Sequence, residues 1–260
     1  NEEIQLLSFH TPTIPFCLTQ PKSNFHTVLT VPDLLCLNSH IPVELRRQWR
    51  LLFASKAHGE SFSTMVNHIK NQGPCVVLVK DNENHVFGGF SSDGFVLSSN
   101  FTGDDQCFVF TLYPKISVSP ATGYNKNFCY LNQHQQTMPN GLGFGGLLEV
   151  SEQPVHFFAL WLDCEYGKGK SQSSGSTYNN PQLSSNENFT FDTLEIWGVG
   201  PKSGQVTEKR TSALDVDPEM KALLAMVGKG GLSDGLREGD TAADTPEFHH
   251  LYSGITPLNE

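Results

Sequence analysis

Between residues 75 and 199 the apolar positions fall in short runs of β-branched and aromatic side chains, separated by turn-forming residues. Runs of this length and composition are typical of β-strands. No helical pattern separates them, so we expect an α+β fold built on a two-layer antiparallel β-sandwich. The predicted strands span residues 75–81, 85–92, 94–99, 107–114, 115–120, 128–132, 147–152, 156–164 and 189–199.

Two flanking helices are predicted ahead of these strands, because the apolar positions there follow helical spacing. The first begins after Pro42, which suits an initial helical turn. Its apolar positions are Leu45, Trp49, Leu52 and Phe53. The second has Ser61 or Ser63 as its N-cap and ends before Gly73 and Pro74. Its apolar positions are Phe62, Met65, Val66 and Ile69.

Two further segments lack a regular pattern. Residues 1–41 mix apolar positions with Pro and His, and we expect the end of an upstream helical region followed by a connector. Because the chain opens on Asn1 rather than Met, we expect it to be part of a longer protein. Residues 166–188 are rich in Gly, Ser and Asn, which predicts a long loop over one end of the sandwich, either a passive connector or a binding loop.

A separate amphipathic helix is predicted at about residues 217–227, inside a C-terminal extension that spans residues 203–260. Asp217 can cap this helix and Pro218 suits its first turn. A helix of about ten residues is not stable alone in water, so its apolar stripe must dock on the chain's own sandwich or insert into a partner. The pattern leaves both open. The stripe consists of Met220, Leu223, Leu224 and Val227. The Gly-rich acidic stretch 229–247 predicts a flexible tail.

Composition excludes some classes of partner. With 17 basic and 27 acidic residues the net charge is −10, so no broad basic face is available for nucleic acid. The longest apolar runs are about six residues, far below the ~20 that cross a bilayer, and we expect no transmembrane segment. Six cysteines spread evenly along so long a chain favour buried, reduced thiols and a cytoplasmic location.

A glycine pattern and the absence of metal motifs bear on cofactors. Gly141, Gly143 and Gly146 spell GxGxxG, but a dinucleotide site needs a helix directly after this loop, and a strand pattern follows instead. We therefore predict a glycine-rich bend where backbones pack closely. The sequence contains no CxxC, HExxH or EF-hand motif, so we predict neither a metal site nor a cofactor.

Two groups of residues could supply a nucleophile. The tetrapeptide HGES at residues 58–61 offers an imidazole, a carboxylate and a hydroxyl, but side chains so near in sequence rarely point at one another, and there is no GxSxG elbow. The thiol of Cys164 could meet His134 or His156 only through the fold. A buried thiol and surface histidines are the simpler interpretation.

Between Trp49 and Gly200 the chain contains, in this order, the segments WRLLFASKAHGESFSTMVNHI, HVFGGF, CFVFTLYP, TGYNKNFCYLN, PNGLGFGG, FFALWLD, STYNNPQLSSNENF and LEIWGVG. With these segments in this order, the chain resembles the TLDc domain family. The resemblance implies a two-layer β-sandwich with flanking helices, which agrees with the strand pattern, and places a TLDc domain at residues 42–202. Ala159 stands where many members have glycine.

The resemblance implies protein binding rather than chemistry. TLDc proteins engage the vacuolar-type proton ATPase and are associated with oxidation resistance, and members with a similar C-terminal extension are linked to lysosomal membranes and mTOR signalling. We therefore predict a non-enzymatic adaptor on the lysosomal membrane. Its expected partners are the catalytic head, peripheral stalk and rotor of this pump, and components of the mTOR pathway. The predicted partner-binding residues are Met220, Leu223, Leu224, Val227 and Glu60.

Two alternatives belong to other functional classes. The first is a thiol or serine hydrolase that uses Cys164 or Ser61 with a histidine. The second is a redox sensor, which needs at least one accessible thiol of low pKa. Both depend on contacts between side chains that are far apart in the sequence.

Overall fold

The fold is described from a computed structural model of the chain. The chain divides into two compact units, residues 1–207 and 208–260, and every described residue belongs to the first. The described residues are 14–18, 26–148 and 156–201. The predicted helix at 217–227 therefore lies outside the described residues.

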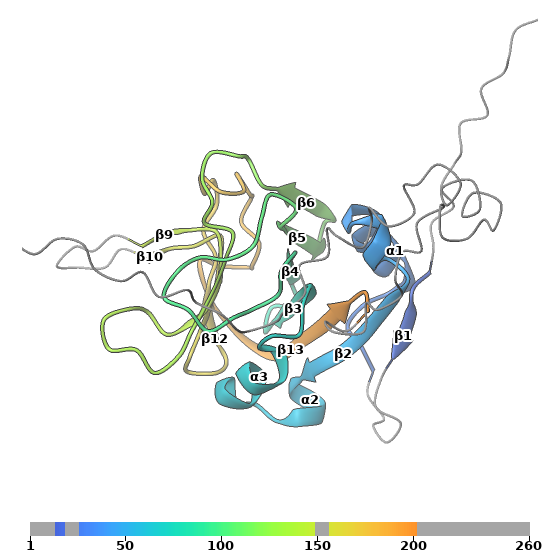
Figure 1. Ribbon diagram of the computed structural model, residues 1–260, viewed down its shortest axis with the longest axis horizontal. Helices are drawn as coiled ribbons and strands as arrows, with labels where there is room; N and C mark the ends of the chain where they lie inside the picture. The colour runs from blue at the N-terminus through green and yellow to red at the C-terminus, as the bar shows by residue number, and fades with distance from the viewer. Residues whose placement is uncertain (1–13, 19–25, 149–155, 202–260) are drawn as a thin grey trace, which may run out of the picture. The chain divides into compact units, whose positions relative to one another are not determined.

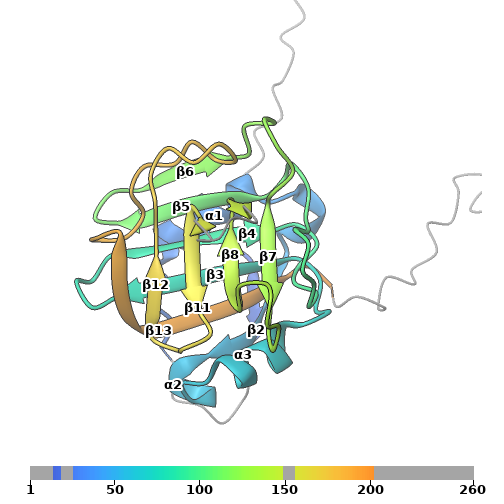
Figure 2. The same ribbon diagram turned by 90° about the vertical axis from the view of Figure 1, so that its left-hand side faces the viewer.

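Two crossing layers of β-strands share one long strand, β13 (Asn188–Val199). The first layer has the order β6-β5-β4-β3-β13-β2-β1, and the second has the order β13-β12-β11-β8-β7. The start of β13 pairs with β12, and the rest of it pairs with β3 and β2. Figure 2 shows the second layer, β12, β11, β8 and β7, running across the strands of the first. The predicted two-layer sandwich is confirmed, although the pair β1–β2 is parallel.

The elements have the following bounds. The first layer contains β1 (Phe16–Leu18), β2 (Gln48–Ala54), β3 (Cys75–Asp81), β4 (Val86–Ser91), β5 (Phe108–Tyr113) and β6 (Ser117–Pro120). The second contains β7 (Cys129–Asn132), β8 (Gly141–Phe144), β11 (Leu160–Asp163) and β12 (Lys168–Lys170). A separate pair joins β9 (Leu147–Leu148) to β10 (His156–Phe157). The helices are α1 (Val31–His40), the short 3₁₀ helix η1 (Val43–Leu45), α2 (Ser55–His58) and α3 (Phe62–Ile69).

Strand β3 explains where the cores lie. Val77 and Val79 point into the core between the layers, where α3 also packs. Val76 and Leu78 point to the other face of the first layer, which α1 covers with Leu37 (Figure 1). Because both faces are covered, this strand is apolar at nearly every position, and the predicted strand 75–81 is confirmed in full.

The predicted first helix after Pro42 is wrong, because that stretch folds as η1 followed by strand β2. Trp49 packs in the core under α1, whereas Leu52 and Phe53 pack in the core between the layers. A strand with both faces covered can carry apolar residues at intervals of three and four, which imitates the period of a helix. The spacing alone therefore pointed to the wrong element.

The predicted second helix is confirmed as α3. The Ser61 hydroxyl accepts the backbone N–H of Thr64 at 3.3 Å, so Ser61 and not Ser63 is the N-cap. Its buried residues are those expected, Phe62, Met65, Val66 and Ile69. Figure 2 shows α2 and α3 together at one end of the sandwich.

The predicted strand 94–99 is wrong, since only Phe95 forms an isolated bridge, to Lys70. Gly94 has a φ of +76°, and a Cβ there would lie 2.0 Å from the carbonyl oxygen of Gly73. This close approach bends the chain away from an extended course, and Val96 becomes exposed.

The remaining predicted strands match the structure with small changes at their ends. The predicted strand 156–164 is divided into β10 and β11. The predicted strand 147–152 begins as β9, and its residues 149–152 lie outside the described part. The predicted strands at 85–92, 107–114, 115–120, 128–132 and 189–199 correspond to β4, β5, β6, β7 and β13.

The GxGxxG segment is a strand for its first four residues, β8, and not a bend. Close approach of backbones is confirmed at Gly141, where a Cβ would lie 2.6 Å from the carbonyl oxygen of Leu162. A Cβ on Gly141 would lie 2.2 Å from the Trp161 ring, and one on Gly143 would lie 2.7 Å from the Phe158 ring. The glycines therefore let two aromatic rings pack closely against β8 on the outer face of the second layer.

The segment 166–188 is more than a passive loop, because it contains β12 and several buried side chains. Tyr178 is 2% exposed and its hydroxyl donates to the carbonyl of Phe128 at 2.9 Å. The Asn180 amide donates to the carbonyl of Gln172 at 2.8 Å. These bonds close one end of the core between the layers.

Residues 26–41 are not only a connector, because they cover the outer face of the first layer. Helix α1 starts with a capping box in which the Thr30 hydroxyl and the Asp33 carboxylate each accept a backbone N–H of the other residue. Leu37 and Ile41 are fully buried. The Trp49 indole N–H donates to the Asn38 side chain at 3.1 Å and so joins β2 to this helix.

Candidate partner-binding surface

Glu60 is the one predicted partner-binding residue inside the described part of the chain. It is exposed on the link between α2 and α3, beside Gly59, whose φ of +87° allows the turn. Within residues 14–18, 26–148 and 156–201, no hydrogen bond or ion pair engages its carboxylate. The other predicted residues, Met220, Leu223, Leu224 and Val227, lie outside the described residues and stay a prediction.

Two histidines lie close to Glu60 in the sequence and form a pair at the same end of the sandwich. The rings of His58 and His68 are 4.5 Å apart, and His58 stacks on Phe53 at 5.7 Å. The Nδ1 of His58 accepts the backbone N–H of Ala54 at 3.0 Å. Burial, and then the neighbouring His68, lower the pKa of His58, so its imidazole is neutral at neutral pH.

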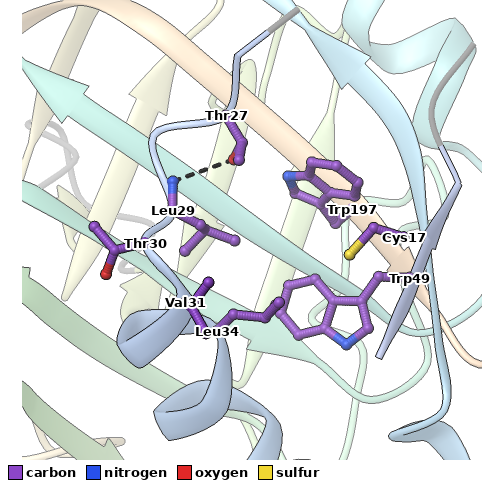
Figure 3. Close-up of a pocket in the computed structure, with 8 residues that line it drawn as sticks. All are labelled: Cys17, Thr27, Leu29, Thr30, Val31, Leu34, Trp49 and Trp197. Atoms are coloured by element: carbon purple, nitrogen blue, oxygen red, sulfur yellow. Dashed lines mark hydrogen bonds between the residues drawn. The ribbon is translucent and has the colours of Figure 1, made fainter. Parts of the chain in front are cut away.

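An apolar pocket of about 220 Å³ opens between the segment before α1 and two tryptophans, as Figure 3 shows. The indole rings of Trp49 and Trp197 are 6.5 Å apart, and Cys17 of β1 lies beside them. Ligand pockets usually have ~300 Å³ or more. This pocket therefore has room for an apolar side chain rather than for a cofactor.

Glu195 is a buried acid beside this pocket, and it holds the segment before α1 by hydrogen bonds. It is 1% exposed and accepts three hydrogen bonds, from the Thr27 hydroxyl at 2.6 Å, the Val28 N–H at 2.8 Å and the Trp197 indole N–H at 3.1 Å. Burial raises the pKa of its carboxyl group. Glu195 is not among the site residues predicted from the sequence, because an acid inside an apolar strand carries no local sign of its hydrogen-bond partners.

In the described part of the chain, neither nucleophile of the hydrolase hypothesis, Ser61 or Cys164, is hydrogen-bonded to a histidine. Ser61 caps α3, and the free nitrogen of His58 is not directed at it by any hydrogen bond. Cys164 is exposed, and among the described residues no hydrogen bond joins it to His134. Desolvation, and then Asp163, raise the pKa of Cys164, which disfavours the reactive thiolate. The side chain of His156 lies outside the described residues.

We expect Ser61→Ala to lower the free energy of unfolding by ~1 kcal/mol, because the Thr64 N–H loses its acceptor. Ser63→Ala is the matched control. Its exposed hydroxyl accepts only from the Gln133 side chain at 2.6 Å, so a loss below ~0.5 kcal/mol is expected. Urea denaturation of both variants measures the difference. Equal losses would contradict the assignment of Ser61 as the cap.

The redox-sensor hypothesis requires one thiol that is both accessible and of low pKa, and in this structure the two properties belong to different cysteines. Cys17, Cys36 and Cys164 are at least partly exposed, and desolvation raises the pKa of each. Cys107 is buried, yet a hydrogen bond from Cys129 lowers its pKa to about 7. No cysteine of the chain therefore combines free access with a low pKa.

Among the described residues, no group of three or more His, Cys, Asp or Glu side chains is arranged to hold a metal ion. In the same part of the chain, no helix is long and apolar enough to span a membrane.

Comparison with known proteins gives the family. The TLDc domain family matches residues 22–200 of the chain, whereas the resemblance of the sequence segments placed the domain at residues 42–202. The MTOR-associated protein MEAK7 of Gallus gallus is 49% identical over 221 residues, which cover 84% of this chain and 46% of that protein. The Homo sapiens protein of that name is 43% identical over 231 residues, which cover 88% and 49%. Oxidation resistance protein 1 of Bos taurus is 31% identical over 172 residues, which cover 65% and 18%.

The match extends over most of the chain but only part of its relatives. The chain spans about half the length of the MEAK7 proteins it matches. The matched region includes both β-layers except β1, and also α1 to α3 and the glycines of β8. The chain belongs to the TLDc domain family.

Proposed function

We propose that this chain is a non-enzymatic regulatory adaptor that binds the vacuolar-type proton ATPase on the cytoplasmic side of the lysosomal membrane and is linked to mTOR signalling. The observation that carries the proposal is its 43–49% identity to proteins named as mTOR-associated, combined with membership of the TLDc family. Engagement of the pump is what the TLDc resemblance implies.

The arrangement of polar side chains supports binding over catalysis. Ser61, His58 and Glu195 each hold backbone or neighbouring groups of the fold. Glu60 is exposed and unengaged within the described residues, which suits contact with a basic partner surface. The apolar stripe predicted at residues 217–227 would add a second, tethered contact, and two modest contacts on one chain bind more tightly than either alone.

The test is retention of the pump from detergent-solubilised lysosomal membranes on the immobilised 260-residue chain. Leu223→Asp with Leu224→Asp should lower retention by about tenfold or more, as expected when apolar anchors worth ~1.4 kcal/mol or more are removed. Leu232→Asp with Leu236→Asp makes the same chemical change in the same extension outside the predicted helix, and should retain the pump as well as the unchanged chain does.

A second pair of variants tests the exposed carboxylate of Glu60. Glu60→Lys should weaken retention severalfold, whereas Asp105→Lys, the same charge reversal at an exposed position before β5, should not. If the unchanged chain retains no pump subunits, the proposed function is wrong. If it retains them and the leucine variant does so equally, the predicted helix has no part in binding.

A further inference from the structure

Two buried thiols, those of Cys107 and Cys129, are in contact where the two layers meet. The Cys129 thiol donates to the Cys107 sulfur at 3.8 Å, and both residues are fully buried. Cys107 directly precedes β5 of the first layer, and Cys129 is the first residue of β7 in the second. A bond between these sulfurs would therefore join the two layers covalently.

A glycine leaves space beside both sulfurs. A Cβ on Gly103 would lie 2.8 Å from the Cys107 sulfur and 3.7 Å from the Cys129 sulfur. Gly103 also has a φ of +92°, which other residues rarely adopt. The backbone therefore passes over the thiol pair without a side chain that would fix the position of the sulfurs.

The surroundings give the two thiols different roles. The backbone N–H of Ser92 donates to the Cys107 sulfur at 3.4 Å, and the Ser92 hydroxyl lies 3.2 Å from it. These contacts, after the larger effect of the Cys129 thiol, lower the pKa of Cys107 to about 7. Burial raises the pKa of Cys129 well above its usual value. Near neutral pH Cys107 is partly thiolate while Cys129 keeps its proton.

We propose that Cys107 and Cys129 form a reversible disulfide on exposure to a hydroperoxide, with Cys107 as the attacking thiol and Cys129 as the resolving thiol. The Cys107 sulfur attacks one peroxide oxygen and the O–O bond breaks, so that Cys107 becomes a sulfenic acid; hydroxide leaves from hydrogen peroxide, and an alkoxide leaves from an alkyl hydroperoxide. The Cys129 sulfur then attacks the Cys107 sulfur, the S–O bond breaks, and water leaves with the thiol proton. The two thiols lose two electrons and the peroxide is reduced to water or an alcohol and water.

Access to Cys107 requires only a local opening. The residue follows the exposed Gln106 in a turn held by the Cys107 N–H bond to the Asp104 carbonyl at 3.1 Å. The Asp104 N–H donates to the Ser92 hydroxyl at 3.2 Å. Loss of these two bonds would expose the Cys107 sulfur while the β-layers stay paired. The sulfurs must then approach from contact distance to ~2.05 Å.

Mass spectrometry of the peroxide-treated 260-residue chain tests the proposal. Folded chain is exposed to hydrogen peroxide, free thiols are alkylated, and the unfolded chain is digested without reductant. We expect a peptide that links Cys107 to Cys129, a loss of two hydrogen atoms from the intact mass, and reversal of both by dithiothreitol. In Cys129→Ser the linked peptide should disappear, and dimedone should label Cys107 as a sulfenic acid.

Two cysteine variants are the controls. Cys75→Ser changes a buried thiol that interacts electrostatically with Cys107, and Cys164→Ser changes an exposed one. Both variants should keep the linked peptide. The proposal is overturned if peroxide modifies only Cys17, Cys36 and Cys164 in the unchanged chain while Cys107 and Cys129 are recovered as free thiols. That result needs no variant to fold.

Discussion

Gly88→Ala is expected to lower the melting temperature by roughly 10 °C or more, or to prevent folding, because it costs on the order of 4 kcal/mol. Gly88 lies in β4 between Leu78 of β3 and Phe110 of β5. A Cβ there would lie 1.8 Å from the Val77 carbonyl oxygen and 3.0 Å from the Phe110 ring. The nearest atom belongs to the backbone of a central strand, so the clash cannot be relieved by turning a side chain. Thermal unfolding followed by circular dichroism measures the effect.

The control for Gly88→Ala is Gly123→Ala, which separates crowding from backbone strain. Gly123 has a φ of +78°, and a Cβ there would meet nothing within 4 Å. The left-handed conformation alone should cost ~1–2 kcal/mol, so the melting temperature should fall by only a few degrees. Similar melting temperatures for the two variants would mean that β3 and β4 do not approach as closely as the structure indicates.

Local sequence patterns predicted the strands well where the apolar run and the turn residues on either side of it indicate the same element. The strand at β3 was found in full, because a run that is apolar on both faces has few other interpretations. The sequence limited the cap of α3 to Ser61 or Ser63, because a capping signal lies within one helical turn, and the structure selects Ser61. The capping box of Thr30 and Asp33 is an equally local signal, and it indicates a helix within the segment 1–41 that was predicted to end in a connector.

The errors came from contacts between residues that are distant in the sequence. Trp49 and Phe53 are buried in different cores. Their spacing therefore comes from the two faces of a strand and not from one face of a helix. The strand expected at 94–99 is broken by the approach of Gly94 to Gly73. Neither the thiol contact of Cys107 with Cys129 nor the packing of Trp161 on Gly141 has a short-range signature.

Glu195→Ala is expected to release the N-terminal segment, residues 26–41, from the first layer. The carboxylate is the acceptor for the Thr27 hydroxyl and the Val28 N–H, and its removal leaves these donors beside an apolar cavity. The loss should be about 3 kcal/mol, which corresponds to roughly hundredfold faster amide exchange in this segment. Hydrogen exchange followed by mass spectrometry measures it, with exchange in β3 as the internal reference.

Two further variants test whether the carboxylate of Glu195 itself holds residues 26–41 in place. Glu195→Gln keeps the shape and one acceptor oxygen, so its exchange rate should fall between those of the unchanged chain and Glu195→Ala. Glu165→Ala removes a carboxylate that is 72% exposed and paired with Lys168 at 2.6 Å, and should leave exchange at 26–41 unchanged, since such surface pairs contribute at most ~1 kcal/mol. Equal exchange in all four proteins would show that apolar packing of Leu37 and Ile41 alone keeps the segment in place. If Glu195→Ala loses protection from hydrogen exchange at residues 26–41 and not in β3, the hydrogen bonds to the Glu195 carboxylate hold this segment on the first layer.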